Sequence, residues 1–167
     1  ARAAERARDE LAYEESVRLF TMALRSHESQ PDADAETRCE LLLALGDAQT
    51  MAGETASARH SFLRVADIAR QVGSPEMLAR AALGYGGRFV WEPEHEFTQS
   101  LTTLLEEALG GLPEDSLLRA KVLARFACAA VSYRGGPVEA RRRQLQEVRS
   151  REAVELARRI GDPATLG

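Results

Sequence analysis

Apolar residues recur every three or four positions through most of this chain, a spacing that places side chains on one face of a helix. Between residues 55 and 72, for example, Ala58, Phe62, Val65, Ala66 and Ala69 form one such stripe. The same spacing predicts helices over residues 11–24, 36–52, 55–72, 75 to about 89, 96–109, 115–133 and from the break at 135–137 to 160. Residues 1–9 are typical of the end of a preceding helix. No segment alternates apolar and polar residues as a half-buried strand would, so we expect about eight helices and no sheet.

Two short segments repeat each other at a long interval. Residues 68–75 (IARQVGSP) and 156–163 (LARRIGDP) share alanine, arginine, glycine and proline at matching places, and the second follows the first by 88 residues. This interval equals two units of about 44 residues, a length found among extended helical-hairpin repeats. Gly73 fits the left-handed position after a helix, Ser74 an N-cap and Pro75 the first turn of the next helix, and Gly161-Asp162-Pro163 repeats these signals. Each segment therefore predicts a tight turn between antiparallel helices.

The predicted helix pair over residues 36–72 carries the residues of a known repeat. Leu45-Gly46, followed by Ala58 and then Phe62, resembles the tetratricopeptide pattern, which has Leu-Gly on its first helix and Ala and Phe on its second. In this pattern Gly46 allows close approach of the second helix, Ala58 lies where the two helices cross, and Phe62 fills the groove between them. Leu83-Gly84 with Phe97 matches more loosely. The resemblance implies an all-α fold, a right-handed α-solenoid of about four antiparallel helix pairs.

The repeat departs from the standard pattern at two positions. Gln49 stands where an aromatic residue is expected three residues after the glycine, and Val65 stands where a small residue is expected after the phenylalanine. The repeat is therefore degenerate, and it is longer than the standard unit.

A wider resemblance covers most of the chain. Residues 39–46 (CELLLALG), 82–91 (ALGYGGRFVW) and 152–163 (EAVELARRIGDP) resemble the helical-repeat region of large bacterial signal-transduction ATPases with LuxR-type or related DNA-binding ends. The resemblance implies repeats that follow a nucleotide-binding module and bind an inducer or partner. It also implies that the repeats transmit the bound state to the rest of the protein. Neither flanking module lies in these 167 residues. Because the chain starts within a helical pattern and stops after a helix-start signal, we expect a single repeat domain over residues 1–167, part of a longer cytoplasmic protein.

Composition supports this interpretation and limits the partners. The chain is 44% hydrophobic but only 5% aromatic, so alanine and leucine supply most of the apolar surface, as in close-packed helices. The net charge of −4 does not mark the surface as a binder of nucleic acid or of an anionic membrane. No apolar run approaches the roughly 18 residues that a membrane span needs. We therefore expect no direct contact with nucleic acid and none with a membrane.

The cysteines and histidines do not form a metal-binding pattern. Cys39 and Cys128 lie within apolar helical patterns and are predicted to be small buried residues in a reducing compartment. His27, His60 and His95 are isolated, without a second ligand three or four residues away, and are predicted to be solvated or capping residues.

Sequence motifs of catalysis are also missing. The glycine-rich segment 84–88 (GYGGR) lacks the spacing and the terminal Lys-Ser/Thr of a Walker loop. No GxSxG or Cys-His constellation is visible. We therefore expect no cofactor and no enzymatic activity.

An aromatic cluster stands out beside these glycines. It consists of Tyr85, Phe89, Val90, Trp91 and Phe97, with several glutamates between them. One interpretation is a recognition surface, since aromatic residues often anchor partners. The other is a core plug at a long turn between helices.

An arginine-rich stretch begins the last predicted helix. Arg141, Arg142 and Arg143 form a secondary candidate for an anion site. The alternative is a solvated helix face with ion pairs one turn apart, such as Glu147 with Arg151 and Glu155 with Arg159.

A solenoid leaves a curved surface lined by the first helix of each pair, which is the usual place for a partner. The candidate binding surface predicted on this basis consists of Gln49, Arg80, Tyr85, Arg88, Trp91, Arg125 and Tyr133. We expect it to bind a protein segment or a small acidic ligand and to act on other domains of the same polypeptide. The function expected is that of a sensor or coupling segment of a bacterial transcriptional regulator. The alternative is an interaction scaffold of another multidomain signalling protein, for example a cyclase.

Overall fold

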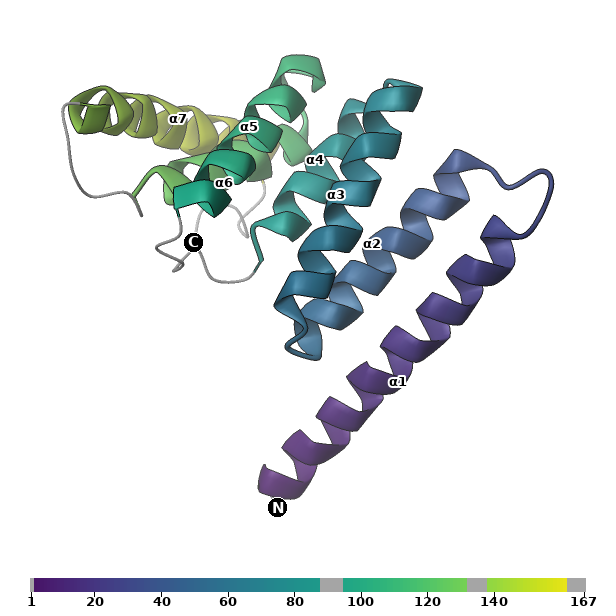
Figure 1. Ribbon diagram of the computed structural model, residues 1–167. Coiled ribbons are helices and arrows are strands. Elements are labelled where there is room, and N and C mark those ends of the chain that lie inside the picture. Colours follow the sequence, from purple (N-terminus) through teal and green to yellow (C-terminus); the bar gives the residue numbers. More distant parts are fainter. Residues whose placement is uncertain (1, 88–94, 132–137, 162–167) are drawn as a thin grey trace. The chain divides into compact units, whose positions relative to one another are not determined.

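The computed structural model describes residues 2–87, 95–131 and 138–161, with side chains over residues 12–87, 97, 99–129 and 147–161. These residues form seven helices and no strand, which confirms the all-α prediction (Figure 1). The helices are α1 (Arg2–Glu28), α2 (Ala35–Met51), α3 (Thr55–Val72), α4 (Pro75–Tyr85), α5 (His95–Gly111), α6 (Leu117–Val131) and α7 (Val138–Ile160). They fall into two compact units, Ala1–Gly73 and Ser74–Gly167.

The first helix is longer than predicted. Residues 2–9 are not the end of a separate helix but the beginning of α1, which continues without a break to Glu28. No glycine or proline occurs before residue 31, so nothing in the backbone interrupts the helix there. This merger accounts for seven described helices where about eight were expected.

Other boundaries differ from the prediction by a few residues. Helix α4 ends at Tyr85, and Gly86 and Gly87 form the turn that follows it. Helix α5 continues past the predicted end at residue 109 and includes Gly110 and Gly111. Helix α6 begins two residues later than predicted, because the Ser116 side chain accepts a hydrogen bond from the backbone N–H of Arg119 at 3.0 Å.

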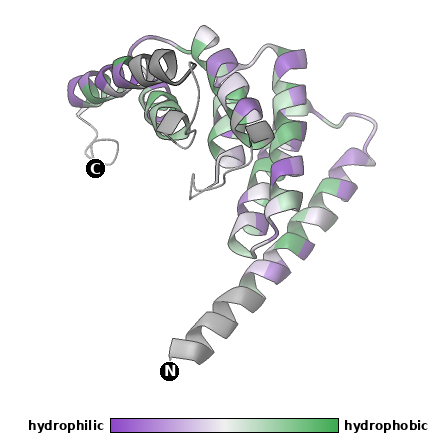
Figure 2. Cartoon of the chain, turned by 60° about the vertical axis from the view of Figure 1, so that its left-hand side comes forward, coloured by the Kyte–Doolittle hydropathy of each residue, from purple (hydrophilic) through white to green (hydrophobic). Residues whose placement is uncertain are grey.

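The first unit is an up-down-up arrangement in which α2 packs against both α1 and α3 (Figure 1). Its core contains side chains that are almost entirely buried, among them Cys39, Leu42, Phe62 and Val65. Helix α1 buries Leu24 on α2 but exposes half of the Leu19 and Met22 side chains. Figure 2 shows this mixed surface as alternating hydrophilic and hydrophobic colours along α1, above the grey segment at the N-terminus.

A close contact joins α2 and α3. A Cβ atom added at Gly46 would lie 2.7 Å from the tip of the Phe62 ring, closer than real Cβ atoms approach. The ring is 1% exposed and is enclosed by the core. Glycine at position 46 therefore lets the ring lie directly against the backbone of α2. Ala58, one turn before Phe62, is also buried and keeps the helices close.

Local signals set the ends of the helices in this unit. The Asp34 carboxylate caps α2 by accepting a hydrogen bond from the backbone N–H of Thr37 at 2.7 Å. Gly73 adopts the predicted left-handed conformation, with φ of +68°, and ends α3. His27 lies buried at the end of α1, and its Nε2 is 3.0 Å from the backbone oxygen of Asp34, which holds the loop between α1 and α2.

The second unit consists of α4 to α7. Helix α4 packs against α5 and α6, and α6 packs against α7. The Ser74 side chain caps α4 and Pro75 occupies its first turn, as predicted, while Gly161 takes the left-handed conformation after α7. Pro75 lies so close to Gly111 that a Cβ there would approach it to 2.7 Å. Fully buried Leu101, Leu105, Val122 and Leu123 form the centre of this unit.

The prediction for the second cysteine is wrong. Cys39 is buried, but Cys128 is exposed on α6. It lies seven residues after exposed Lys121, and a separation of two helical turns places both on the solvent-facing side of α6. The apolar residues of α6 on either side of it, Ala127 and Ala129, are buried.

We expect Gly46→Ala to destabilise the protein by about 1–3 kcal/mol, because the added methyl group forces the buried Phe62 ring to move. Alanine has the higher helix propensity, so propensity alone predicts the opposite sign. Gly110→Ala is a matched control, because Gly110 also lies in a helix and a Cβ there has no neighbour within 4 Å. Urea denaturation of the two variants should give opposite signs, and a stabilised Gly46→Ala protein would contradict the packing argument.

A second prediction concerns the cap of α2. The hydrogen bonds from Thr37 lower the pKa of the Asp34 carboxyl below its ordinary value. The cap therefore contributes stability above the pKa of the unfolded chain, and this contribution is lost as the pH falls through the lower folded pKa. In Asp34→Asn the side chain can still accept the hydrogen bond but does not titrate. Thermal melts from neutral pH to pH 3 should show a larger fall in Tm for the wild type than for Asp34→Asn, and parallel curves would count against the cap.

Candidate functional site

A groove lies in the first unit between α1 and α3, with α2 beneath it. Its volume is about 580 Å³, within the range of pockets that hold small molecules. The lining side chains come from all three helices and are Thr21, Leu24, Arg25, Glu28, Leu45, Gln49, Ala56, Ser57, His60, Ser61 and Arg64.

Residues of α1 and α3 face each other at matching heights along the groove. Helices α1 and α3 run in the same direction, because each is antiparallel to α2 (Figure 1). An ion pair of 2.7 Å between Glu28 and Arg64 joins the walls at one end. One turn earlier on each wall stand Arg25 and His60. The groove is therefore lined along its length by polar residues from opposite helices.

One carboxylate binds two arginines at the end of the groove. Glu28 Oε1 lies 2.7 Å from Arg64 on α3 and 2.9 Å from Arg38 on α2. These ion pairs connect the last residue of α1 to both other helices of the unit. All three side chains are between 32% and 42% exposed, so solvent screening keeps the stabilisation by each pair small, about 0–1 kcal/mol. In the groove, these ion pairs neutralise the charge of Glu28, the only acidic residue among those that line it.

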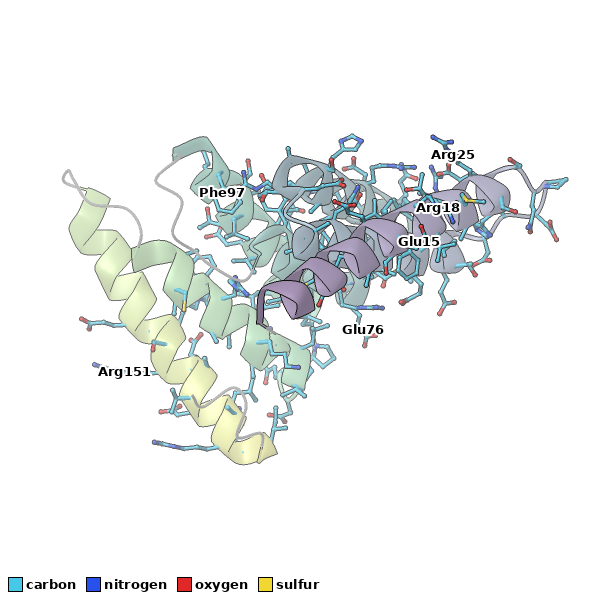
Figure 3. The ribbon with its side chains drawn as sticks, turned by 90° about the horizontal axis from the view of Figure 1, so that it is seen from below. Glu15, Arg18, Arg25, Glu76, Phe97 and Arg151 are labelled. Atoms are coloured by element: carbon cyan, nitrogen blue, oxygen red, sulfur yellow. The ribbon has the colours of Figure 1, made fainter. Side chains whose placement is uncertain are left out.

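Of the two arginines that line the groove, Arg25 has no ion-pair partner in the described part of the chain. Its side chain is exposed and makes no ion pair or hydrogen bond with any residue that the structure describes. Figure 3 shows it projecting away from α1, whereas Arg18 and Glu15 on the same helix form an ion pair of 2.6 Å. Its guanidinium group is available to an anion in the groove.

A polar pair forms the floor. Gln49 on α2 and Ser61 on α3 are both buried, and the Ser61 hydroxyl donates a hydrogen bond to Gln49 Oε1 at 2.8 Å. Since the amide oxygen accepts this bond, the two N–H groups of Gln49 Nε2 are left as donors. Leu24 and Leu45 supply the aliphatic part of the lining.

The predicted binding surface is only partly exposed. Gln49 is buried in the floor of the groove, so it presents an amide edge and not an open surface. Tyr85 is also buried, because its ring stacks on Phe97 at 5.3 Å between centroids. Arg80 lies exposed on α4. Arg88, Trp91 and Tyr133 lie outside the described residues.

The stacking of Tyr85 on Phe97 tests the two interpretations of the aromatic cluster. Tyr85 and Phe97 join the end of α4 to the beginning of α5 in the core of the second unit. For these two residues the structure agrees with the core-plug interpretation. Phe89, Val90 and Trp91 lie outside the described residues, as the figures show by a grey trace.

Arg125 was predicted to lie on an open binding surface, but its side chain contacts the backbone after α4. Its half-buried guanidinium donates hydrogen bonds to the backbone oxygens of Gly86, at 3.2 Å, and Gly87. Burial lowers the pKa of Arg125 below its ordinary value, while Cys128 acts weakly in the opposite direction. The side chain satisfies carbonyl groups after α4 that the helix leaves without partners. A Cβ at Gly86 would meet this side chain at 3.3 Å, so the turn and the arginine are closely fitted.

The structure describes the side chains of the arginine-rich helix, α7, only from residue 147 onward. Arg141, Arg142 and Arg143 belong to α7, but their side chains lie outside the described residues. Arg151 reaches Glu147 at 3.9 Å, as predicted for a solvated face. Arg159 does not pair with Glu155, because it contacts Asp115 of the segment before α6 at 3.3 Å.

The sequence did not indicate Arg25, His60 and Arg64 as a group. The only available signal is their helical spacing from other polar residues, which places Arg25 four residues after Thr21 and Arg64 four residues after His60. Such spacing gives a polar face on one helix. It does not reveal that two such faces border the same groove.

Comparison with known proteins gave no relative, since no protein-family model, no curated protein and no solved structure matches this chain. Within the part of the chain that the structure describes, none of the helices has the length and apolar character required to cross a bilayer. In that same part, His, Cys, Asp and Glu residues do not gather in groups of three or more that could bind a metal ion. Function is therefore inferred from the geometry of the groove.

The floor of the groove allows a direct test of its hydrogen bond. We expect Ser61→Ala to destabilise the protein by about 1–3 kcal/mol, because it leaves the buried Gln49 oxygen without a donor. The double variant Gln49→Leu/Ser61→Ala should be closer to the wild type than Ser61→Ala alone, since both polar groups are then removed. Denaturant unfolding of the two single variants and the double variant measures this coupling. Strictly additive effects would mean that the hydrogen bond does not stabilise the floor.

Proposed function

We propose that this chain is a helical-repeat scaffold that binds a protein segment or a small acidic ligand and transmits binding to other domains of the same polypeptide. In this proposal it is the sensor or coupling segment of a bacterial transcriptional regulator. The observation that carries the proposal is the groove of the first unit, whose only lining acid is ion-paired while Arg25 and His60 stand unpaired on opposite walls.

The groove suits binding better than catalysis. Its one carboxylate, Glu28, is already engaged in ion pairs with Arg38 and Arg64. Arg25, His60 and Gln49 instead supply hydrogen-bond donors. A set of donors above an aliphatic floor favours recognition of an anion.

The same groove offers a route by which binding affects the rest of the unit. A ligand held between α1 and α3 contacts two helices that are linked through α2 and through the ion pairs of Glu28. Occupation therefore favours one spacing of α1 and α3 over others. A ligand that binds one arrangement more tightly shifts the population toward it, which is the physical requirement for coupling.

The wider assignment to a transcriptional regulator comes from the resemblance of residues 39–46, 82–91 and 152–163 to repeats of that class. The Gly46–Phe62 contact is compatible with the repeat packing expected from it. The alternative, a scaffold of another multidomain signalling protein such as a cyclase, has the same support from the repeats. The two proposals differ in what ligand binding in the groove would control: transcription in the first, and another activity such as cyclic-nucleotide synthesis in the second.

We expect deletion of the gene in its host to change the transcript levels of a defined set of genes. Full-length wild type should restore them, and so should Arg151→Ala, a control in which an arginine with a 79% exposed side chain is removed. Full-length Arg25→Ala/His60→Ala should not restore them, although both substituted residues are exposed and the variant should melt at the wild-type temperature. The measurements are transcript sequencing and cyclic-nucleotide levels in the same cultures.

Three results would contradict parts of this proposal. Unchanged transcripts after deletion would exclude a transcriptional regulator, and changed cyclic-nucleotide levels in those cells would favour the alternative. Transcripts that depend on the protein but are fully restored by Arg25→Ala/His60→Ala would show that the groove does not carry the function.

A further inference from the structure

The donors of the groove converge from three helices. Arg25 comes from α1, Gln49 from α2 and His60 from α3, and all three line the same space. Arg25 and His60 form no ion pair or hydrogen bond through their side chains with the residues that the structure describes. The Gln49 oxygen accepts the hydrogen bond of Ser61, and the amide nitrogen adds two N–H donors to the lining.

No carboxylate in the lining is without a cationic partner. The only carboxylate in the lining, Glu28, binds two arginines. An incoming cation would meet Arg25 and gain no free carboxylate in return, so the charge of the groove selects against it. An anion would gain charge-assisted hydrogen bonds.

The size of the groove favours a small molecule over a long segment. Its volume of about 580 Å³ is typical of small-molecule pockets. The Glu28–Arg64 ion pair crosses from one wall to the other and closes one end. A peptide strand that ran through the groove would have to break this pair, whereas a short ligand fits beside it.

We propose that the groove binds a small organic anion, a carboxylate or a phosphate monoester, with a short aliphatic part. Its charged end binds the guanidinium of Arg25, with further hydrogen bonds from His60 and from the amide of Gln49. Its aliphatic part lies toward Leu24 and Leu45 in the lining. This assignment rests on the proposed function and specifies the class of ligand that acts there.

The test is a titration of the full-length protein with hexanoate, hexyl phosphate and hexanol, followed by saturation-transfer NMR of the ligand. The two anions should bind with millimolar dissociation constants, and hexanol, which has the same chain without the charge, about tenfold more weakly. A stronger signal from one of the two anions identifies whether the ligand is a carboxylate or a phosphate.

Variants locate the binding in the groove. Arg25→Glu should weaken binding of the anions at least about tenfold, whereas Arg25→Lys should retain most of it because the positive charge remains. Arg151→Glu, which changes charge by the same amount at an exposed position of α7, should bind as the wild type does. Thermal melts of each variant establish that the fold is unchanged, which the exposure of Arg25 leads us to expect.

The proposal is overturned if neither anion gives a signal, if hexanol binds as tightly as hexanoate, or if Arg25→Glu leaves the affinity unchanged. Binding of a hexaglutamate peptide in the absence of binding by either small anion would make the groove a peptide site, contrary to this proposal. These failures differ from failure of the proposed function. If no small anion binds but Arg25→Ala/His60→Ala still fails to restore transcription, the scaffold function stands and only the ligand class is wrong.

Discussion

The distance between α2 and α3 is set by the contact between the Gly46 backbone and the ring of Phe62. A side chain of any size at position 46 would meet the ring at less than van der Waals distance. Because the helices approach this closely, Ala58 and Val65, each about one turn from Phe62 along α3, are also buried. The position of α3 on α2 in turn determines which of its side chains face α1, and so determines the groove.

The floor of the groove is polar because position 49 is a glutamine. Gln49 stands where the tetratricopeptide pattern has an aromatic residue, and the structure shows it bonded to Ser61. Buried polar groups need partners, so this hydrogen bond keeps the amide in a fixed orientation. An aromatic ring would have filled the same space with apolar surface. The Gln49–Ser61 pair gives the floor a donor instead, and Glu28 at the end of the groove is neutralised by two arginines.

The helices and several of their ends could be predicted, whereas the exposure of individual residues could not. The bounds of α3 and the left-handed glycines at its end and after α7 agree with the prediction, because helical spacing and capping are local properties. Residues 2–9 were wrongly separated from α1, since a weak apolar stripe at a helix end is ambiguous without a glycine or proline. Cys128 was wrongly expected to be buried, because only packing shows which face of α6 is covered.

The candidate site also separates what local sequence predicts from what packing decides. From the sequence alone, the helical character of the chain, the turn at Gly73–Pro75 and a close contact between Gly46 and Phe62 could be predicted. The sequence also drew attention to Gln49, but as part of an open surface with Tyr85 and Arg125. Only the tertiary structure placed Gln49 under a groove, stacked Tyr85 on Phe97 and turned Arg125 onto backbone carbonyls. The physical reason is range: helical periodicity and caps depend on residues within about two turns of each other, whereas a groove depends on side chains of three helices that meet only when the helices pack.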